Sequence, residues 1–533
     1  MADSIQTAKI SCRGGLDLRS TTQDLLQKPG FAIDLTNYEQ NIGGGYRRIN
    51  GFTKVTENVL PGSGQIEGTA LYNNGYVMCR GDAVYFSFDG DTWEQVNKDV
   101  STLSNQATLQ AAAALPRTGA TVYTFDTFTQ GAAAGRIDLL IHSDVGIPAV
   151  LTIMGSSLGT AQYRYVEITS GGITDTGYGL VHNDQHVVAG DPQEPSTFYV
   201  STTSDMEDFT TGQSGAYSVA DPIVGLKSFR DIIYIFCENS IWQATGLNTG
   251  TASIQPVTRD VGCVDGHTIQ EIGGDLIFLA NDGLRTLGAT ARIDDVELST
   301  TSLLINELLQ DILNTKSNLQ FTSCVIKSKN QYRLFYTNAA KVAEEQEGLI
   351  ATFYPNQETG QSWSFSKLKG IESTAITHGE LNGQERGVHG DISGGLYMHD
   401  DGNTFDGTEI ESSFQTPYFD FGDSGVRKNL HDIILYLNPE GPVTLEIALS
   451  YDYEDINTTH QPFAYTVDQI DAPAVYGQAV YGTDSYGARL LPTTKVNTQG
   501  SGFTASYRFT TVGEAAPFTI QGFNVNFMAS GRI

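Results

Sequence analysis

Short apolar segments separated by polar turns recur along most of the chain, and this pattern predicts antiparallel β-structure. It is clearest in residues 222–288, where two successive units share one plan. In each unit an apolar segment meets a charged or glycine turn, a very apolar segment follows, and a second turn leads into a third segment. The very apolar segments are Ile232–Phe236 and Leu276–Leu279. A recurring unit of three or four antiparallel strands is typical of a β-propeller blade.

The same pattern predicts an all-β protein with a β-propeller over residues 66–405. At roughly 40–50 residues per blade, this length corresponds to about six to eight blades. Residues 1–65 are predicted to be an N-terminal arm that joins the propeller or a partner. Residues 406–533 contain longer alternating segments, Leu430–Leu437 and Val443–Tyr451, around a Pro-Glu-Gly turn. These segments predict a C-terminal domain that resembles a β-sandwich.

Helical patterns interrupt the strands at two places. In residues 301–313, Leu304, Leu308 and Ile312 recur with the period of a helix, which predicts an amphipathic helix there. The alanine-rich segment Gln110–Leu115 is compatible with either a helical turn or an insertion.

Composition agrees with a β-rich fold and excludes one class of function. The chain of 533 residues has 57 glycines, 25 tyrosines and 25 phenylalanines, and only 17% of its residues are charged. Its 61 acidic and 31 basic residues give a net charge of -30. A protein that grips nucleic acid needs clustered Lys and Arg side chains against the phosphates. We therefore expect no tight binding of nucleic acid by the chain as a whole.

The cysteines and the hydropathy pattern indicate where the chain folds. The five cysteines are widely spaced, form no C-x-x-C pair, and are predicted to be buried free thiols. The N-terminus lacks the apolar core of a secretory signal, and no apolar run approaches the ~20 residues of a membrane helix. These features predict folding in a reducing cytoplasm and no membrane span.

One turn resembles a motif found on propeller blades. Residues 87–93 read Ser-Phe-Asp-Gly-Asp-Thr-Trp, one residue shorter than the Asp-box sequence S-x-D-x-G-x-T-W. In such turns Asp and Thr side chains bond to the backbone of their own hairpin. Asp89, Thr92 and Trp93 are therefore predicted to have a structural role.

No arrangement of residues demands catalysis or a metal. His182 and His186 have H-x-x-x-H spacing but lack the glutamate of a zincin, and a strand pattern follows them. Asp400–Asn403 is rich in oxygen ligands, but Phe405 occupies a position where a Ca²⁺ loop needs a ligand, so a turn is the better interpretation. We expect no catalytic residue, no metal site and no cofactor, and the protein is predicted not to be an enzyme.

Two groups of residues are candidate contacts with other subunits or partners. Arg47 and Arg48 follow a triple-glycine bend and are expected to face solvent or a partner. Tyr476, Tyr481 and Tyr486 belong to a Tyr-Gly repeat with a period of five residues, which fits neither helix nor strand. Tyrosine is a favoured interface anchor because it is large and amphipathic. The alternative for this loop is a disordered tip.

Three stretches of the chain are similar to one protein family. They are residues 44–52 (GGYRRINGF), residues 261–285, which include GGDLIFLANDGLR, and residues 518–532. Together they resemble the tail-nozzle proteins of short-tailed bacteriophages (podoviruses), also called tail tubular protein B or packaged-DNA stabilisation proteins. The resemblance spans most of the chain and rests on structural turns rather than on catalytic motifs.

This resemblance implies a virion structural protein of the phage tail, made in the host cytoplasm. It implies a homo-hexameric ring below the portal and adaptor that continues the DNA channel, retains packaged DNA and lets it pass during ejection. The implied partners are further copies of the chain, the adaptor or portal, other tail proteins, and genomic DNA that passes without sequence-specific binding. The net charge of -30 adds the expectation of an acidic lumen, since each Lys or Arg contact to phosphate would slow the DNA.

Two other interpretations stay open at this point. A carbohydrate-binding or glycan-cleaving β-propeller acting in receptor recognition fits the Asp-box-like turn and the tyrosine-rich loop. A bacterial scaffold propeller without a link to phage fits the same residues.

Overall fold

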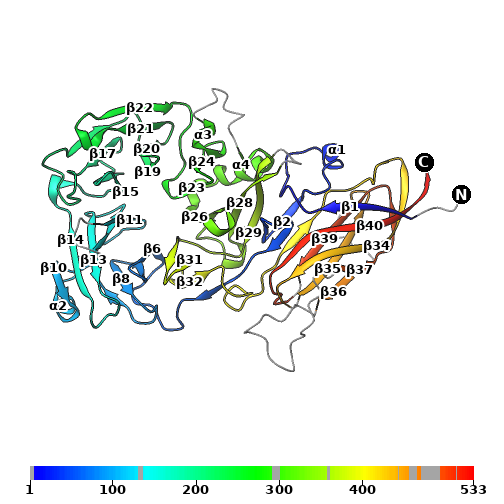
Figure 1. Ribbon diagram of the computed structural model, residues 1–533, viewed down its shortest axis with the longest axis horizontal. Coiled ribbons are helices and arrows are strands. Elements are labelled where there is room, and N and C mark those ends of the chain that lie inside the picture. Colours follow the sequence, from blue (N-terminus) through cyan, green and yellow to red (C-terminus); the bar gives the residue numbers. More distant parts are fainter. Residues whose placement is uncertain are drawn as a thin grey trace.

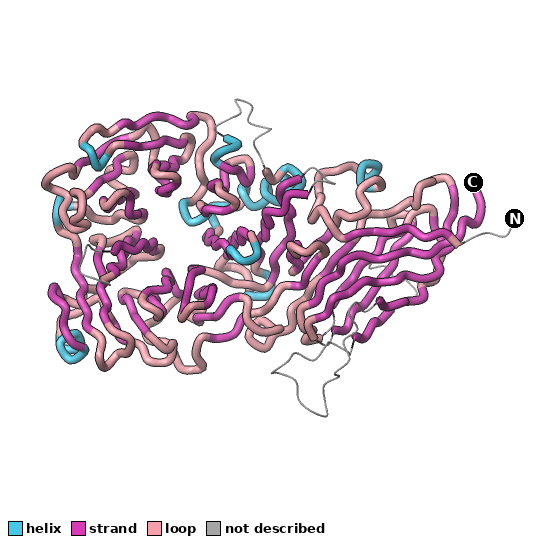
Figure 2. The backbone as a smooth tube through the Cα atoms, viewed as in Figure 1, coloured by secondary structure: helices cyan, strands magenta, loops and turns pink. Residues whose placement is uncertain are grey.

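The computed structural model describes residues 5–129, 136–290, 301–356, 361–441, 443–454, 465–469, 493–511 and 513–532. These residues form mainly β-strands, arranged in eight sheets (Figures 1 and 2). Six small sheets of three to five strands are arranged as a β-propeller, and the predicted fold class is confirmed. Two larger sheets, of seven and nine strands, extend into the part that Figure 1 places to the right of the propeller.

Each small sheet is an antiparallel blade. The strands that face the centre of the ring are β6, β11, β15, β19, β23 and β30, one from each blade. The strands of these blades are β5 (Phe52–Lys54), β6 (Ile66–Tyr72), β7 (Gly75–Arg80), β8 (Ala83–Ser87), β9 (Glu94–Gln95), β10 (Val100–Asn105), β11 (Tyr123–Thr129), β12 (Ile137–Ser143), β13 (Ala149–Met154), β14 (Gln162–Glu167), β15 (Tyr178–His182), β16 (Gln185–Ala189), β17 (Thr197–Val200), β18 (Gly215–Ser218), β19 (Ile223–Phe229), β20 (Ile232–Cys237), β21 (Ile241–Thr245), β22 (Ser253–Thr258), β23 (Gln270–Ile272), β24 (Asp275–Ala280), β25 (Gly283–Thr286), β30 (Ala375–Leu381), β31 (Gln384–Gly390) and β32 (Leu396–His399).

The two repeats singled out in the sequence are neighbouring blades. The first is the sheet β19-β20-β21-β22 and the second is the sheet β23-β24-β25. Ile233, Ile235, Ile277 and Leu279 of the central strands are fully buried. Burial of these apolar side chains between adjacent blades is the main force that holds the ring together.

The two larger sheets contain strands from both ends of the chain. Their strands are β1 (Gln6–Ser11), β2 (Asp34–Thr36), β3 (Tyr38–Gln40), β4 (Tyr46–Arg48), β26 (Gln320–Ile326), β27 (Gln331–Thr337), β28 (Glu347–Asn356), β29 (Gln361–Lys369), β33 (Ser413–Gln415), β34 (Val426–Pro439), β35 (Val443–Tyr451), β36 (Tyr465–Gln469), β37 (Thr493–Asn497), β38 (Ser501–Gly502), β39 (Ala505–Thr511) and β40 (Phe518–Arg532). The order β3-β4-β40-β34-β37 makes the core of the seven-stranded sheet. It packs on the β33-β39-β35 part of the nine-stranded sheet through buried apolar residues such as Ile433, Val525, Ile447 and Phe509.

The nine-stranded sheet joins the propeller to the sandwich. Its strands β26–β29 stand in the ring between the β23–β25 and β30–β32 blades, so the ring has a seventh unit besides its six separate sheets. β2 then pairs with β29 in parallel and with β33 in antiparallel orientation, which carries the sheet into the sandwich. The two parts therefore share one continuous sheet and one apolar core.

The segment predicted as an arm is divided between the two parts. β5 pairs with β32, with Thr53 opposite Met398, and so supplies the outer strand of the last blade. β1, β3 and β4 belong to the seven-stranded sheet, where β1 and β4 both pair with β40. A strand from one end of the chain thus closes the ring against a strand that lies far along the sequence.

Helices are few. The helical pattern in residues 301–313 corresponds to a 3₁₀ turn, Leu303–Ile305, followed by α4 (Asn306–Asn314), whose Leu309 and Ile312 are buried. The alanine-rich segment contributes to α2 (Gln106–Ala111), which the side chain of Asn105 caps. The other α-helices in the described segments are the single turns α1 (Thr22–Leu25) and α3 (Leu287–Thr290). Within the described ranges no helix has the length and apolarity needed to span a membrane.

The five cysteines are buried free thiols, as predicted. Burial raises the pKa of all five, to about 12 for Cys237, Cys263 and Cys324. The neutral thiol is therefore the stable form at each position.

Candidate functional site

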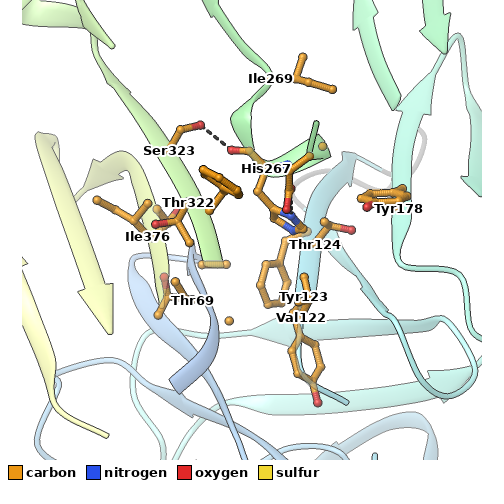
Figure 3. A pocket seen from close by; sticks show the side chains of 18 of the residues that line it. Thr69, Val122, Tyr123, Thr124, Tyr178, His267, Ile269, Thr322, Ser323 and Ile376 are labelled. Atoms are coloured by element: carbon orange, nitrogen blue, oxygen red, sulfur yellow. Dashed lines mark hydrogen bonds and ion pairs between the residues drawn. The ribbon is translucent and has the colours of Figure 1, made fainter. Parts of the chain in front are cut away.

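A cavity of about 470 Å³ lies at the centre of the propeller (Figure 3). Inner-strand residues of β6, β11, β15, β19, β23, β26 and β30 line it. Its wall is built mostly from backbone, hydroxyl and amide groups. The ionisable side chains of the wall, tyrosines aside, are Glu67, Asp126, Lys227, Asp265 and His267.

Many polar groups of the wall bond to the neighbouring blade. Ser323 donates a hydrogen bond to the His267 carbonyl at 2.5 Å, and Gln270 donates to the Ser323 carbonyl at 3.0 Å. Thr374 donates to the Ile66 carbonyl at 2.6 Å. These contacts cross from one inner strand to the next, so they fix the width of the cavity.

Four buried side-chain atoms of the wall lack any hydrogen-bond partner in the described part of the chain. They are the hydroxyl of Thr69, which is only 6% exposed, Oε2 of Glu67, the hydroxyl of Tyr123 and Nε2 of His267. The described residues likewise give Lys227 no ion pair within 4 Å. A buried polar group without a partner costs about 1–3 kcal/mol, so an occupant of the cavity would stabilise these groups.

The ionisable groups of the cavity have shifted pKa values. Burial, together with Asp144 and Asp82, raises the pKa of Glu67 to about 7. Burial also lowers the pKa of Lys227, although Asp126 and Glu271 oppose this. Near neutral pH Glu67 is therefore partly protonated and can both donate and accept a hydrogen bond.

His267 and Asp265 form a separate pair at the cavity wall. Asp265 Oδ1 lies 2.9 Å from His267 Nδ1 and also accepts the His267 backbone N–H at 2.8 Å. Burial acts to lower the pKa of His267, but the charge of Asp265 raises it overall. This histidine therefore carries positive charge more readily than the other buried histidines.

The histidines with H-x-x-x-H spacing do not converge on a common point. His182 Nδ1 lies 2.8 Å from Ser228 Oγ, whereas His186 Nε2 lies 2.6 Å from Nε2 of His142 in the adjacent blade. His186 Nδ1 lies 3.0 Å from the Met206 carbonyl, to which only an N–H can donate. Burial lowers the pKa of both histidines and keeps both rings neutral, so His186 Nε2 accepts the hydrogen bond that His142 Nε2–H donates. In the portions of the chain that are described, no group of three or more His, Cys, Asp or Glu residues is arranged to hold a metal.

Buried charges form a cluster where the propeller meets the sandwich. The side chain of Arg333 is fully buried and donates to Glu39 Oε2 at 3.0 Å and to Asp400 Oδ1 at 2.8 Å. Lys329 Nζ also lies 3.1 Å from Glu39 and 3.0 Å from Asp400. Although burial alone would raise the pKa of Asp400, Arg333 and Lys329 hold it well below its usual range. We call Glu39, Lys329, Arg333 and Asp400 the junction cluster.

The expectation that Arg47 and Arg48 face solvent or a partner is wrong for Arg48. Its side chain is fully buried and donates to the carbonyls of Ala515 at 2.6 Å and Asn403 at 3.1 Å. Arg47 is 14% exposed and binds both carboxylate oxygens of Glu440, at 2.6 and 2.8 Å. Because the two arginines satisfy groups that lie far along the sequence, a local pattern gave no signal of their burial.

The aspartates considered as a Ca²⁺ loop have other partners. Asp400 belongs to the junction cluster, and Asp401 Oδ2 accepts the Thr53 hydroxyl at 2.6 Å. The tyrosines of the Tyr-Gly repeat, Tyr476, Tyr481 and Tyr486, lie outside the described residues, so their role stays a prediction.

The Asp-box-like turn has the geometry of a structural hairpin. Asp89 Oδ1 accepts hydrogen bonds from the Ser87 hydroxyl at 2.9 Å and from the backbone N–H groups of Asp91 at 3.0 Å and Thr92 at 2.9 Å. Trp93 Nε1 donates to the Gly90 carbonyl at 2.8 Å. Thr92 takes part through its backbone rather than through its hydroxyl.

We expect Asp89→Ala to lower the free energy of unfolding by about 1–2 kcal/mol, because three donors lose their acceptor. Equilibrium denaturation would measure this loss. Glu57→Ala is the matched control, since Glu57 is 87% exposed and lies 3.9 Å from its nearest cation. Its effect should stay within about 0.5 kcal/mol. Equal effects of the two substitutions would contradict a structural role for Asp89.

Comparison with known proteins gives no family for this chain. No protein-family model matches it, and no curated protein matches it. Among solved structures, an ancestral GH74 enzyme is 11% identical over 68% of this chain and 53% of its own, with a TM-score of 0.39. This chain thus spans about half the length of that enzyme.

Two further solved structures are similar at the same low level. Raptor from Chaetomium thermophilum is 10% identical over 72% of this chain and 30% of its own, with a TM-score of 0.38. A glycoside hydrolase family 43 arabinoxylan arabinofuranohydrolase from Bacillus subtilis is 10% identical over 90% of this chain and 99% of its own, with a TM-score of 0.25. These low scores carry no argument about activity, and the fold assignment rests on the sheets of the chain itself.

Proposed function

We propose that the chain is a structural subunit of a bacteriophage tail. In this role copies of it form a ring-shaped nozzle below the portal and adaptor, which retains packaged DNA and lets it pass during ejection. The observation that carries the proposal is the location of the three stretches that resemble tail-nozzle proteins. β4 pairs with β40, with Tyr46 opposite Ile520, and both residues share an apolar core with Ile277 and Leu279 of β24. All three stretches therefore contribute to the apolar core that the propeller and the sandwich share.

The way the two parts are joined supports a mechanical role. A subunit in the wall of a tube that holds packaged DNA has to resist bending between its parts. Here the propeller and the sandwich share a nine-stranded sheet, and the junction cluster adds buried ion pairs between β3, β27 and the loop after β32. Buried ion pairs contribute geometric specificity when both partners stay satisfied.

The small size of the central cavity supports a conduit that lies outside the propeller. A volume of about 470 Å³ is that of a small-molecule site rather than of a channel for duplex DNA. The DNA would then pass along the axis of the ring, between subunits. With a net charge of -30, the chain offers few cations that would hold the phosphates.

Imaging of the assembled particle tests the proposal. We expect electron microscopy of the purified protein mixed with its adaptor to reveal six-fold rings, and antibody labelling of virions to mark the tail. A protein that stays monomeric beside a functional adaptor, or that is absent from virions, would overturn the proposal. Release of reducing sugar by the purified subunit would favour a glycan-cleaving propeller instead. A ring lumen lined mainly by Lys and Arg would contradict the expectation of an acidic lumen but not the nozzle role itself.

A further inference from the structure

The proposed nozzle role gives no function to the central cavity of the propeller. Its wall nevertheless contains polar groups that the protein itself does not satisfy. The Thr69 hydroxyl is 6% exposed and has no partner, and Glu67 Oε2 is also without one, among the residues described. Lys227 lines the same cavity and makes no ion pair within 4 Å among the described residues, although Asp126 and Glu271 lie near enough to act on its pKa. Groups of this kind gain hydrogen bonds when a polar molecule enters the cavity.

The mixture of acidic and basic groups around the cavity favours a neutral ligand over a strongly ionic one. A small anion would be attracted by Lys227 but repelled by the carboxylates of Glu67, Asp126 and Asp265. A small cation would be repelled by Lys227. A neutral ligand avoids both penalties and still needs donors and acceptors that match an ammonium, a hydroxyl and a carboxyl group. Hydroxyl groups meet this need because each of them both donates and accepts.

The remaining wall suits the carbon skeleton of such a ligand. The ring of Tyr178 and the side chains of Ile269 and Ile376 lie around the same space as Thr69 (Figure 3). Sites for small molecules combine apolar walls with a few polar groups that fix orientation, in volumes of roughly 300–1,000 Å³. The cavity of about 470 Å³ falls within this range.

We propose that the central cavity is a binding site for a small neutral polyhydroxyl molecule, the size of a mono- or disaccharide, held by Thr69, Lys227 and Glu67. The site binds without cleavage, and it is independent of whether the chain forms a nozzle.

Binding to the full-length protein tests this proposal. The probes are glucose, N-acetylglucosamine and maltose, with sodium phosphate and spermidine as charged counterparts at the same concentrations. We expect at least one sugar to raise the unfolding midpoint and to give saturable heat in calorimetry, because a ligand of the folded state stabilises it by mass action. The proposal is overturned if no sugar binds at up to 100 mM, or if phosphate or spermidine binds in the cavity in place of the sugars.

Two substitutions then locate the site. Thr69→Val keeps the shape of the side chain and removes a hydroxyl that has no hydrogen-bond partner among the described residues, and Lys227→Met removes the ammonium. We expect each to weaken sugar binding at least tenfold. The controls Thr7→Val and Lys495→Met lie in the sandwich, on β1 and β37, and should leave affinity within twofold. Sugar binding that survives both cavity substitutions would overturn the proposal. Should Lys227→Met fail to fold, Thr69→Val alone decides.

Discussion

Replacement of Arg333 by Met is expected to lower the free energy of unfolding by about 3–5 kcal/mol. The guanidinium is fully buried and bridges two carboxylates, Glu39 and Asp400, which lie far apart in the sequence. Glu39 is also buried, with a side chain that is 3% exposed. Methionine fills similar space but leaves these carboxylates with less compensating charge. Equilibrium denaturation at pH 7.5, followed by tryptophan fluorescence, would measure the loss.

Two further variants make this prediction specific. Arg333→Lys keeps the charge but loses the fork that reaches both carboxylates at once, so its effect should lie between those of the wild type and Arg333→Met. Lys341→Met removes an ion pair to Glu347 whose side chains are 42% and 48% exposed, and should cost no more than about 1 kcal/mol. If Arg333→Met proved as mild as Lys341→Met, the junction cluster would not stabilise the joint.

Acidification is expected to produce the second large effect, a fall in the free energy of unfolding as the pH drops from 6.5 towards 4. His142, His186, His389 and His399 are buried. Burial lowers the pKa of His186 to about 4 and of His389 to about 3, and holds the pKa of His142 and His399 well below the usual value. In the unfolded chain a histidine has a pKa of about 6.5.

The direction of this change in the free energy of unfolding follows from which state of the chain, folded or unfolded, binds the protons. Between pH 6.5 and 4 the unfolded chain takes up protons at these histidines and the folded chain does not. Each histidine therefore removes up to about 1.4 kcal/mol of stability per pH unit, and the full contribution is present above pH 6.5. Glu67, whose pKa is raised to about 7, and His267, whose pKa Asp265 raises, act in the opposite direction, because the folded chain binds these protons first. These two groups offset only part of the effect of the four histidines.

His389→Phe isolates one of these contributions. Neither ring nitrogen of His389 has a hydrogen-bond partner within the described part of the chain. The ring packs against Phe52 at 4.9 Å and Tyr397 at 5.3 Å between centroids, which phenylalanine can also do. We expect the slope of stability against pH to become smaller by up to about 1.4 kcal/mol per pH unit. Denaturation curves at pH 7.5, 6 and 5 measure it, and an unchanged slope would rule out His389 as a contributor.

The sequence by itself determined the features that depend on neighbouring residues. The very apolar segments Ile232–Phe236 and Leu276–Leu279 lie within β20 and β24, because short apolar runs between turns form buried strands wherever they are placed. The turn at Asp89 formed as expected because its partners lie within four residues. Local spacing likewise revealed α4, whose apolar face has the helical period.

Only the tertiary structure decided the features that join distant parts of the chain. Backbone hydrogen bonds between strands use the same groups whatever the side chains are. The sequence therefore did not indicate that β5 pairs with β32 or that β2 pairs with β29. Arg48 is buried because the carbonyls of Ala515 and Asn403 accept its hydrogen bonds, and both lie more than 350 residues away. The central cavity exists for the same reason, since its wall consists of single strands from every unit of the ring. Local patterns fix which strands and turns form, whereas long-range pairing and the satisfaction of buried polar groups fix how they are joined.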